Sequence, residues 1–189
     1  MQYQLVNSGS IAEFIIKKSK FIASLYYLEN EEQIKEKLLE FKKEHKDANH
    51  ICYAYVLPSK EKYFDDDEPS GTAGLPILNL LKQNKLVNVL AVVIRYFGGV
   101  KLGSGGLIRA YANATKEALK LSEFKPFEVY KELEFATTYE ELPLINHLKE
   151  EEWFQIAKKE FNEKVIITFT VKEEKIDELK QLLNTLFKR

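Results

Sequence analysis

One unbroken apolar run constrains this chain more than any other feature. Val89 to Ile94 (VLAVVI) is six apolar residues long and rich in β-branched side chains, without the polar alternation of a half-buried strand. The run predicts a strand covered on both faces, within Leu86–Phe97. A membrane-spanning helix would need roughly 18 consecutive apolar residues. The chain is therefore expected to build a sheet with further structure packed on each side.

Helical and strand patterns alternate around this run. We expect strands at Phe21–Leu28 and His50–Leu57, a helix at Glu29–His45, a loop at Pro58–Thr72, a helix from about Pro76 to Gln83, and a glycine loop at Gly98–Gly106. A helix follows, with a buried stripe formed by Leu107, Tyr111, Ala114, Ala118 and Leu121. Arg109 lies off that stripe.

The last third of the chain has a separate pattern. We expect strands at Val129–Thr137, Trp153–Phe161 and Val165–Val171, a helix at Glu140–Glu150, and a final helix with Ile176, Leu179, Leu183 and Leu186 inward. This βαββα order matches most of a ferredoxin-like, split-βαβ sandwich without a clear last strand. The sequence therefore predicts an α+β protein of two domains, residues 1–124 and 125–189.

Composition limits the class of protein. The 189 residues are 45% apolar, which is enough for a core without covalent staples. The single cysteine, Cys52, excludes an internal disulfide framework and a cysteine-based zinc site. The first residues (MQYQLVNSGS) lack a basic region followed by an apolar one, so we expect a cytoplasmic protein with no membrane partner. The oligomeric state is left open.

Charge is unevenly distributed although the formal net charge is only -1. Ser70–Leu121 holds seven basic residues and one acid, a local charge of +6, and seven of the eight glycines. Four acids, Asp65–Glu68, come directly before it. Adjacent carboxylates repel one another unless they are solvated, bound to a cation or turned toward basic groups.

Two segments carry the strongest functional signal: FDDDEPSGTAG (Phe64–Gly74) and VVIRYFGGVKLGSGGLIRAY (Val92–Tyr111). Each places flexible backbone before a helix start, where unpaired N–H groups attract anions. We expect them to converge into one cationic hollow. The candidate anion- or nucleic-acid-binding residues are Ser70, Gly71, Thr72, Arg95, Lys101, Gly103, Ser104, Gly105, Gly106 and Arg109. The alternative is that the glycines of these segments only allow tight turns and bind no ligand.

Other chemical motifs are weak. Gly98 and Gly103 have the first spacing of a P-loop, but Ser104 and Gly105 stand where its lysine and hydroxyl residue belong. Asp65 and Asp66 are weak candidates for Mg²⁺, and His50 with Cys52 supplies too few ligands for a metal. No nucleophile and base pair is evident. We therefore assign no catalytic residue, metal or cofactor.

At these motifs the sequence resembles the IMPACT/YigZ family. The shared pattern is DxEPSGTAG-P-L near Asp66–Leu78 and RYFGG-KLG-GGL-RAY at Arg95–Tyr111, preceded by His50-x-Cys-Tyr-Ala-Tyr. The resemblance extends over nearly the whole chain. This chain departs from the family pattern at Asp67, where glycine is usual, at Leu75, where a basic residue is common, and at Ile94, where threonine is common.

The resemblance implies an N-terminal α/β sandwich like domain IV of elongation factor G and a ferredoxin-like C-terminal domain like its domain V. It also implies an association with translation, because the eukaryotic relative regulates that process. The expected function is a non-enzymatic, translation-associated regulator whose basic glycine-rich groove binds RNA, the ribosome or a translation-related protein. The alternative is an enzyme for a phosphorylated small molecule or nucleotide, with the Gly/Ser loop as phosphate cradle.

Overall fold

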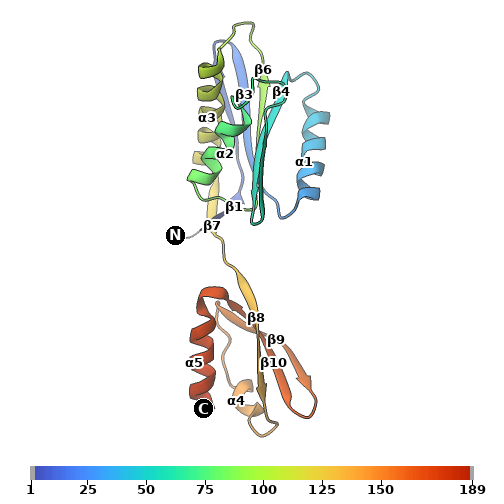
Figure 1. Cartoon of the computed structure of the whole chain (residues 1–189), viewed down its shortest axis with the longest axis vertical. Helices are drawn as coiled ribbons and strands as arrows, with labels where there is room; N and C mark the ends of the chain where they lie inside the picture. The colour runs from blue at the N-terminus through green and yellow to red at the C-terminus, as the bar shows by residue number, and fades with distance from the viewer. Residues whose placement is uncertain (1–2, 188–189) are drawn as a thin grey trace. The chain divides into compact units, whose positions relative to one another are not determined.

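The computed structural model of the chain describes residues 3–187. Its contacts divide the chain into two compact units, one extending to Phe127 and the other beginning at Glu128 (Figure 1). The division therefore comes after Phe127 rather than after Phe124. The reason is strand β7 (Glu123–Pro126), which pairs with β1 (Gln4–Ser8) and ties the end of the first unit to its beginning.

A five-stranded antiparallel sheet forms the centre of the first unit. Its order is β2-β3-β6-β4-β5. The strands are β2 (Ile11–Ile16), β3 (Ser19–Tyr27), β4 (His50–Leu57), β5 (Lys60–Phe64) and β6 (Val89–Tyr96). The apolar run is β6, the middle strand, and Val89–Arg95 is buried throughout. The prediction of a strand covered on both faces is therefore correct.

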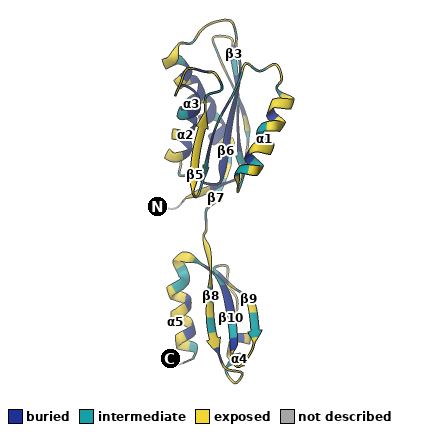
Figure 2. Cartoon of the chain, turned by 45° about the vertical axis from the view of Figure 1, so that its right-hand side comes forward, coloured by how far each residue is buried: buried dark blue, intermediate teal, exposed yellow. Residues whose placement is uncertain are grey.

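Helices cover both faces of that sheet (Figure 1). Helix α1 (Glu31–Glu44) packs Ile34 and Phe41 against one face, in a cluster with Leu90, Val92 and Ile94 of β6. Helices α2 (Gly74–Gln83) and α3 (Ser104–Leu121) pack together on the other face. Side chains of a strand alternate between faces, so β6 contributes to both cores. Figure 2 shows the result: β6 is buried, whereas the outer face of α1 is exposed.

The second unit is a smaller α+β sandwich. Its elements are β8 (Tyr130–Thr137), α4 (Leu142–Asn146), β9 (Phe154–Phe161), β10 (Val165–Lys172), a short 3-10 turn at Glu173–Lys175, and α5 (Ile176–Leu186). The antiparallel sheet has the order β8-β10-β9. The third strand thus lies between the first two, which is the arrangement of a split βαβ unit. Buried residues of β10 and α5 form its core.

Some elements differ from the sequence prediction. Strands β1, β2 and β7 were not predicted, and β5 lies inside the expected loop Pro58–Thr72. Strand β5 (KEKYF) is exposed along its whole length at the sheet edge, so it lacks the apolar alternation that marks a half-buried strand. The expected helix Glu140–Glu150 is only α4, and Leu121, the last residue of α3, is 63% exposed rather than buried. Within residues 3–187, no helix is both long and apolar enough to span a membrane.

Candidate functional site

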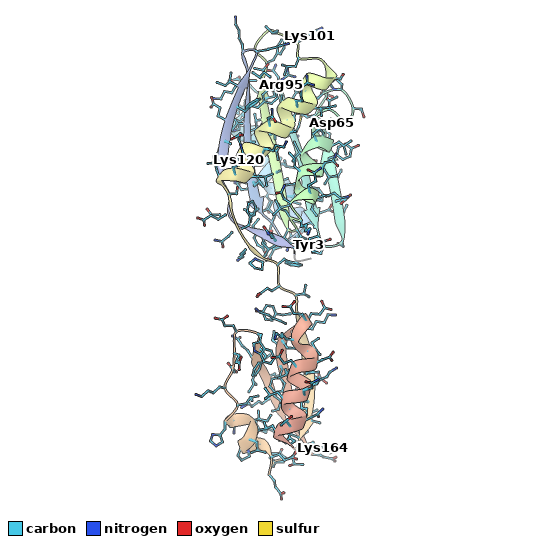
Figure 3. The ribbon with its side chains drawn as sticks, turned by 90° about the vertical axis from the view of Figure 1, so that its left-hand side faces the viewer. Tyr3, Asp65, Arg95, Lys101, Lys120 and Lys164 are labelled. Atoms are coloured by element: carbon cyan, nitrogen blue, oxygen red, sulfur yellow. The ribbon has the colours of Figure 1, made fainter. Side chains whose placement is uncertain are left out.

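The two glycine-rich segments meet at one hollow of about 430 Å³ in the first unit. Glu68 and Pro69 come from the first segment, and Arg95, Phe97 and the stretch Lys101–Ser104 come from the second. Asn49, His50 and Leu107 complete the lining. Of the predicted site residues, the structure thus brings Arg95, Lys101, Gly103 and Ser104 together. Figure 3 shows Lys101 beside the start of α3 and Lys120 near its other end.

The acidic turn is part of the fold rather than a free charged loop. Asp65 Oδ1 accepts hydrogen bonds from the N–H groups of Ala73 (3.0 Å) and Gly74 (2.8 Å), and Asp65 Oδ2 accepts one from Gly71 (2.9 Å). Ala73 and Gly74 are the N-cap and first residue of α2, and Gly71 belongs to the turn before it. A carboxylate at a helix N-terminus satisfies unpaired N–H groups and the helix dipole together. The N-terminus of α2 therefore already holds an anion, supplied by the chain itself.

This arrangement corrects two predictions for the first segment. The N–H and hydroxyl of Thr72 both donate to Pro69 O and Gly71 N–H donates to Asp65, so these donors belong to the turn; Ser70 lies outside the hollow. The weak Mg²⁺ candidates are also used internally, because Asp66 Oδ2 accepts the Ile51 N–H at 2.6 Å. Within residues 3–187, no group of three acidic, histidine or cysteine side chains is placed to hold a metal.

A departure from the family pattern has a structural cost at this turn. Asp67 has φ of 64°, in the left-handed region where glycine is favoured. The resemblance places glycine at this position. The chain adopts the same backbone with an aspartate, a residue that tolerates left-handed geometry better than most others.

Buried charges lie at the inner end of the hollow. Arg95 Nη1 donates to Glu68 Oε1 at 2.6 Å, and the two side chains are only 6% and 4% exposed. Tyr111 also donates to Glu68 Oε1, at 2.8 Å, and burial raises the pKa of Tyr111, so its hydroxyl stays protonated. The expectation of a wholly cationic hollow is therefore wrong at this end, because an internal carboxylate takes up the charge of Arg95.

One donor of Arg95 remains unused. Arg95 Nε is buried and has no hydrogen-bond partner within residues 3–187. The guanidinium lies between two rings, 5.5 Å from the centroid of Phe21 and 5.4 Å from that of Phe97. A buried N–H without an acceptor is costly, so Arg95 Nε is an unsatisfied donor on a residue that lines the hollow.

His50 presents a second inner polar group. Its Nδ1 lies 2.6 Å from the carbonyl oxygen of Asp66. A carbonyl oxygen can only accept, so Nδ1 carries a proton in this contact. The other nitrogen, Nε2, is 3.9 Å from Glu68 Oε1. The backbone contact thus fixes the ring and leaves Nε2 as the nitrogen available to a ligand.

The outer end of the hollow is the start of α3. The first intrahelical bond there runs from Leu107 N to Gly103 O, and no side chain caps the helix. The N–H groups of Ser104, Gly105 and Gly106 therefore have no acceptor within residues 3–187. The first turn contains no acid. The start of α3 is therefore open, whereas that of α2 is already occupied by the Asp65 carboxylate.

The glycines of the second segment differ in why they are needed. A Cβ on Gly98 would lie 2.0 Å from the Lys18 backbone, and Gly103 has φ of 70°, so the fold itself requires both. Gly105 has neither constraint: a Cβ there would meet only Arg109 Nη1, at 3.8 Å. Glycine in a helix costs about 0.5–1 kcal/mol relative to alanine. The tight-turn explanation therefore accounts for Gly98 and Gly103 but not for Gly105.

Two exposed cations flank the start of α3. Arg109 reaches back over the first turn toward Gly105, and Lys101 lines the hollow. Neither has an ion-pair partner within the described part of the chain, whereas Lys82 and Lys120 pair with Glu61 and Glu117. Part of the local charge of +6 is thus neutralised by ion pairs, and the charges of Lys101 and Arg109 at the start of α3 remain unpaired.

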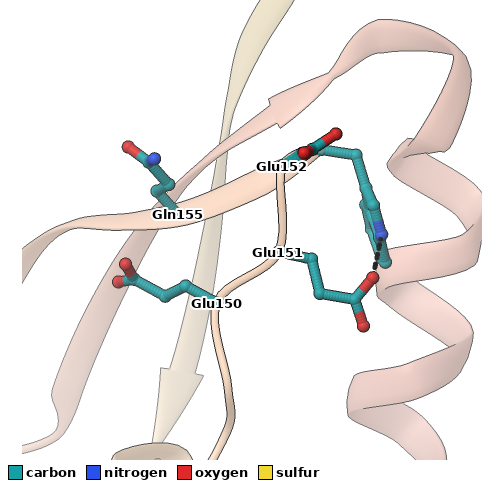
Figure 4. A pocket seen from close by; sticks show the side chains of 5 residues that line it. Glu150, Glu151, Glu152 and Gln155 are labelled. Carbon is teal, nitrogen blue, oxygen red and sulfur yellow. Dashed lines mark hydrogen bonds between the residues drawn. The ribbon is translucent and has the colours of Figure 1, made fainter.

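The second unit has a hollow of opposite character. It measures about 560 Å³ and is lined by Glu150, Glu151, Glu152, Trp153 and Gln155 (Figure 4). Trp153 Nε1 donates to Glu151 Oε2 at 2.7 Å, and Glu150 Oε1 accepts the N–H of Ile156. Three carboxylates repel an anionic ligand. The start of α3 is therefore the better candidate site for anions.

Sequence reasoning missed several lining residues. Glu68 was considered only as one of four adjacent acids, and His50 only beside Cys52 as too few ligands for a metal and as part of the family motif. Their meeting depends on the pairing of β4 with β6, which places His50 opposite Arg95. Phe97 was noted as a possible stacking residue, and it is 44% exposed. Asn49, whose Oδ1 accepts the Phe97 N–H at 2.7 Å, had no signal.

The fold and the hollow together define a two-domain α+β protein with an open, glycine-rich helix start. The model of the Impact N-terminal domain matches residues 17–119, more than half of the chain. The chain therefore belongs to the IMPACT family.

Relatives support this assignment along most of the chain. An IMPACT family member of Haemophilus influenzae is 36% identical over 183 residues, 93% of this chain and 88% of that one. The IMPACT family member YvyE of Bacillus subtilis is 46% identical over 120 residues, 62% of this chain and 55% of its own length. A solved structure described as a hypothetical protein is 28% identical, with a TM-score of 0.71 over 98% of this chain and 93% of that one.

Proposed function

We propose that this protein is a translation-associated regulator that binds RNA at the start of α3 and carries out no chemistry on it. The observation that carries the proposal is the contrast between two helix starts, since α2 is capped by Asp65 and α3 is uncapped. Helix N-termini with glycine-rich backbone are common phosphate sites. The link to translation rests on the family resemblance.

RNA is favoured over an acidic protein by the groups at the hollow. Lys101 and Ser104 line the hollow, and the unpaired N–H groups of Ser104–Gly106 and the cation of Arg109 lie on the first turns of the same helix. Such a set of donors suits the three-dimensional oxygen array of a phosphate. The exposed ring of Phe97 beside them suits a nucleobase, and stacking on aromatic side chains is the usual way in which proteins hold single-stranded RNA. A carboxylate-rich peptide would use the charge but not the ring.

A salt series tests the proposal. The full chain is titrated into a fluorescent single-stranded RNA, and anisotropy gives the dissociation constant at several salt concentrations. If Lys101 and Arg109 neutralise two phosphates, log K against log salt should have a slope of about -1.4. Absence of RNA binding, or binding without a salt slope, would contradict the proposal. Displacement of RNA by an acidic peptide at equal charge concentration would instead favour a protein partner.

The Arg109→Ala variant separates binding from stability. Arg109 is exposed and off the apolar stripe, so its loss should leave the free energy of unfolding within about 0.5 kcal/mol of the parent. RNA affinity should fall severalfold and the salt slope should flatten. Lys116→Ala is the matched control, because it removes one exposed charge from the same helix about 10 Å further along. Equal losses from both variants would contradict a site at the start of α3.

A further inference from the structure

We infer that the hollow receives a single nucleotide with a terminal phosphate, with the phosphate at the start of α3 and the base against Phe97. This inference rests on the proposed function and narrows its ligand. The shared chemistry is a phosphomonoester joined to a nucleoside. It can come from the phosphorylated end of an RNA strand or from a free nucleoside monophosphate.

The size of the hollow limits what enters it. Its volume of about 430 Å³ lies in the lower half of the range, about 300–1,000 Å³, of small-ligand pockets. Surfaces that bind a run of single strand extend over about 4–16 nucleotides per binding fold. A hollow of this volume holds one nucleotide unit rather than a stretch of RNA backbone.

The outer end of the hollow carries more positive charge than is needed to neutralise one internal phosphodiester of an RNA strand. A phosphodiester carries one negative charge, whereas a phosphomonoester carries about -1.5 to -2 near neutral pH and has a third terminal oxygen. The unpaired N–H groups of Ser104–Gly106, the Ser104 hydroxyl, Lys101 and Arg109 offer several donors and two unpaired cations. Space for the phosphate exists because a Cβ on Gly103 would meet nothing within 4 Å.

The inner end fixes the orientation. Glu68 is buried there and forms an ion pair with Arg95, so the inner end offers no net positive charge to a phosphate, whereas the outer end does. The groups left for a neutral ligand are the unpartnered Arg95 Nε and the Nε2 of His50. A nucleobase has a polar edge for such groups and apolar faces for the ring of Phe97 and the side chains of Pro69 and Leu102. A nucleotide with its phosphate at the outer end and its base at the inner end matches the groups at both ends of the hollow.

The test is calorimetric titration of the full chain with five unlabelled probes. Three are one RNA octamer carrying a 5′-phosphate, a 3′-phosphate or no terminal phosphate, and the other two are adenosine monophosphate and inorganic phosphate. We expect at least one phosphorylated octamer to bind about tenfold or more tightly than the unphosphorylated one. Adenosine monophosphate should compete with it, and inorganic phosphate alone should bind more weakly.

Each outcome bears on a different claim. Equal affinity for all three octamers overturns the inference and leaves RNA binding in place. Binding of adenosine monophosphate without binding of any octamer supports the inference with the free nucleotide as ligand and removes RNA from the proposed function. No binding of any probe overturns both.

Two variants place the parts of the ligand. Phe97→Ala removes the ring and should weaken the phosphorylated octamer about tenfold, the effect of losing one base stack. Lys101→Ala should reduce the preference for the phosphorylated over the unphosphorylated octamer, because it removes a charge from the phosphate end. Lys116→Ala is again the control. If Lys101→Ala weakens both octamers by the same factor, the terminal phosphate does not lie at the start of α3.

Discussion

The two glycine-rich turns of the first unit look alike in sequence and differ in what satisfies their helix. At the start of α2, Asp65 accepts three backbone N–H groups, so the turn is complete without a ligand. At the start of α3, neither a side-chain cap nor an acidic residue is present in the first turn. One aspartate before the turn therefore separates a helix start that the chain satisfies itself from one that it leaves open.

The same comparison explains the two central arginines. Arg95 is 5% exposed and paired with Glu68, whereas Arg109 is exposed on α3 without an ion pair in the described residues. A buried charged group interacts mainly with the charge paired with it. An exposed charged group is available to a ligand that approaches from solvent. The local charge of +6 therefore overstates the number of cations available to a ligand.

The largest expected effect comes from breaking the buried pair. Arg95→Met leaves the Glu68 carboxylate buried without its cation and should lower the free energy of unfolding by about 3–5 kcal/mol. Urea denaturation measures it. The double variant Arg95→Met, Glu68→Leu should regain much of the loss, because neither charge then remains buried. Arg109→Met is the control and should change stability by less than about 0.5 kcal/mol. A similar loss of stability in both single variants would contradict the difference between a buried, paired Arg95 and an exposed, unpaired Arg109.

A smaller effect is expected from the cap of α2. Asp65→Ala leaves the N–H groups of Gly71, Ala73 and Gly74 without their acceptor and should destabilise the chain by about 2 kcal/mol, the upper end for a helix cap. Asp65→Asn keeps one side-chain oxygen and should lose less. Thermal and urea unfolding give both values. Unchanged stability in Asp65→Ala would mean that the acidic turn is not structural.

The smallest effect should have the opposite sign. Gly105→Ala adds a methyl group where only the Arg109 guanidinium lies within 4 Å, and alanine favours the helix. The variant should be more stable by about 0.5 kcal/mol and bind RNA more weakly, because the methyl group narrows the approach to the N–H groups. Urea unfolding and anisotropy measure the two changes. Unchanged or improved affinity would remove the functional explanation for this glycine.

Local pattern was sufficient for much of the fold. The unbroken run in β6 and the apolar stripe of α3 were predicted because each pattern reports its own burial. Strand β5 was not, because an exposed edge strand is held by hydrogen bonds to β4 rather than by apolar side chains. The short pairing of β1 with β7 joins residues about 120 positions apart, and nothing local marks it.

The sequence was enough to find the segments that form the candidate site, but not to tell which of their charged side chains pair with one another. Helix starts, glycines and basic residues are visible in sequence, so Lys101, Ser104 and Arg109 could be proposed directly. Which acid meets which base depends on strand register, and the register of β4 against β6 brings His50 beside Arg95. The pairing of Glu68 with Arg95, 27 residues away, therefore required the structure.

Backbone amide resonances can show whether a phosphorylated ligand occupies the start of α3. The full chain, labelled with ¹⁵N, is titrated with a phosphorylated RNA octamer, and each amide shift is followed. We expect the amide resonances of Ser104, Gly105 and Gly106 to shift together and saturate, while those of Gly71, Ala73 and Gly74 stay in place because Asp65 already accepts their hydrogen bonds. Shifts at the start of α2, or RNA binding with no shift at the start of α3, would contradict this expectation.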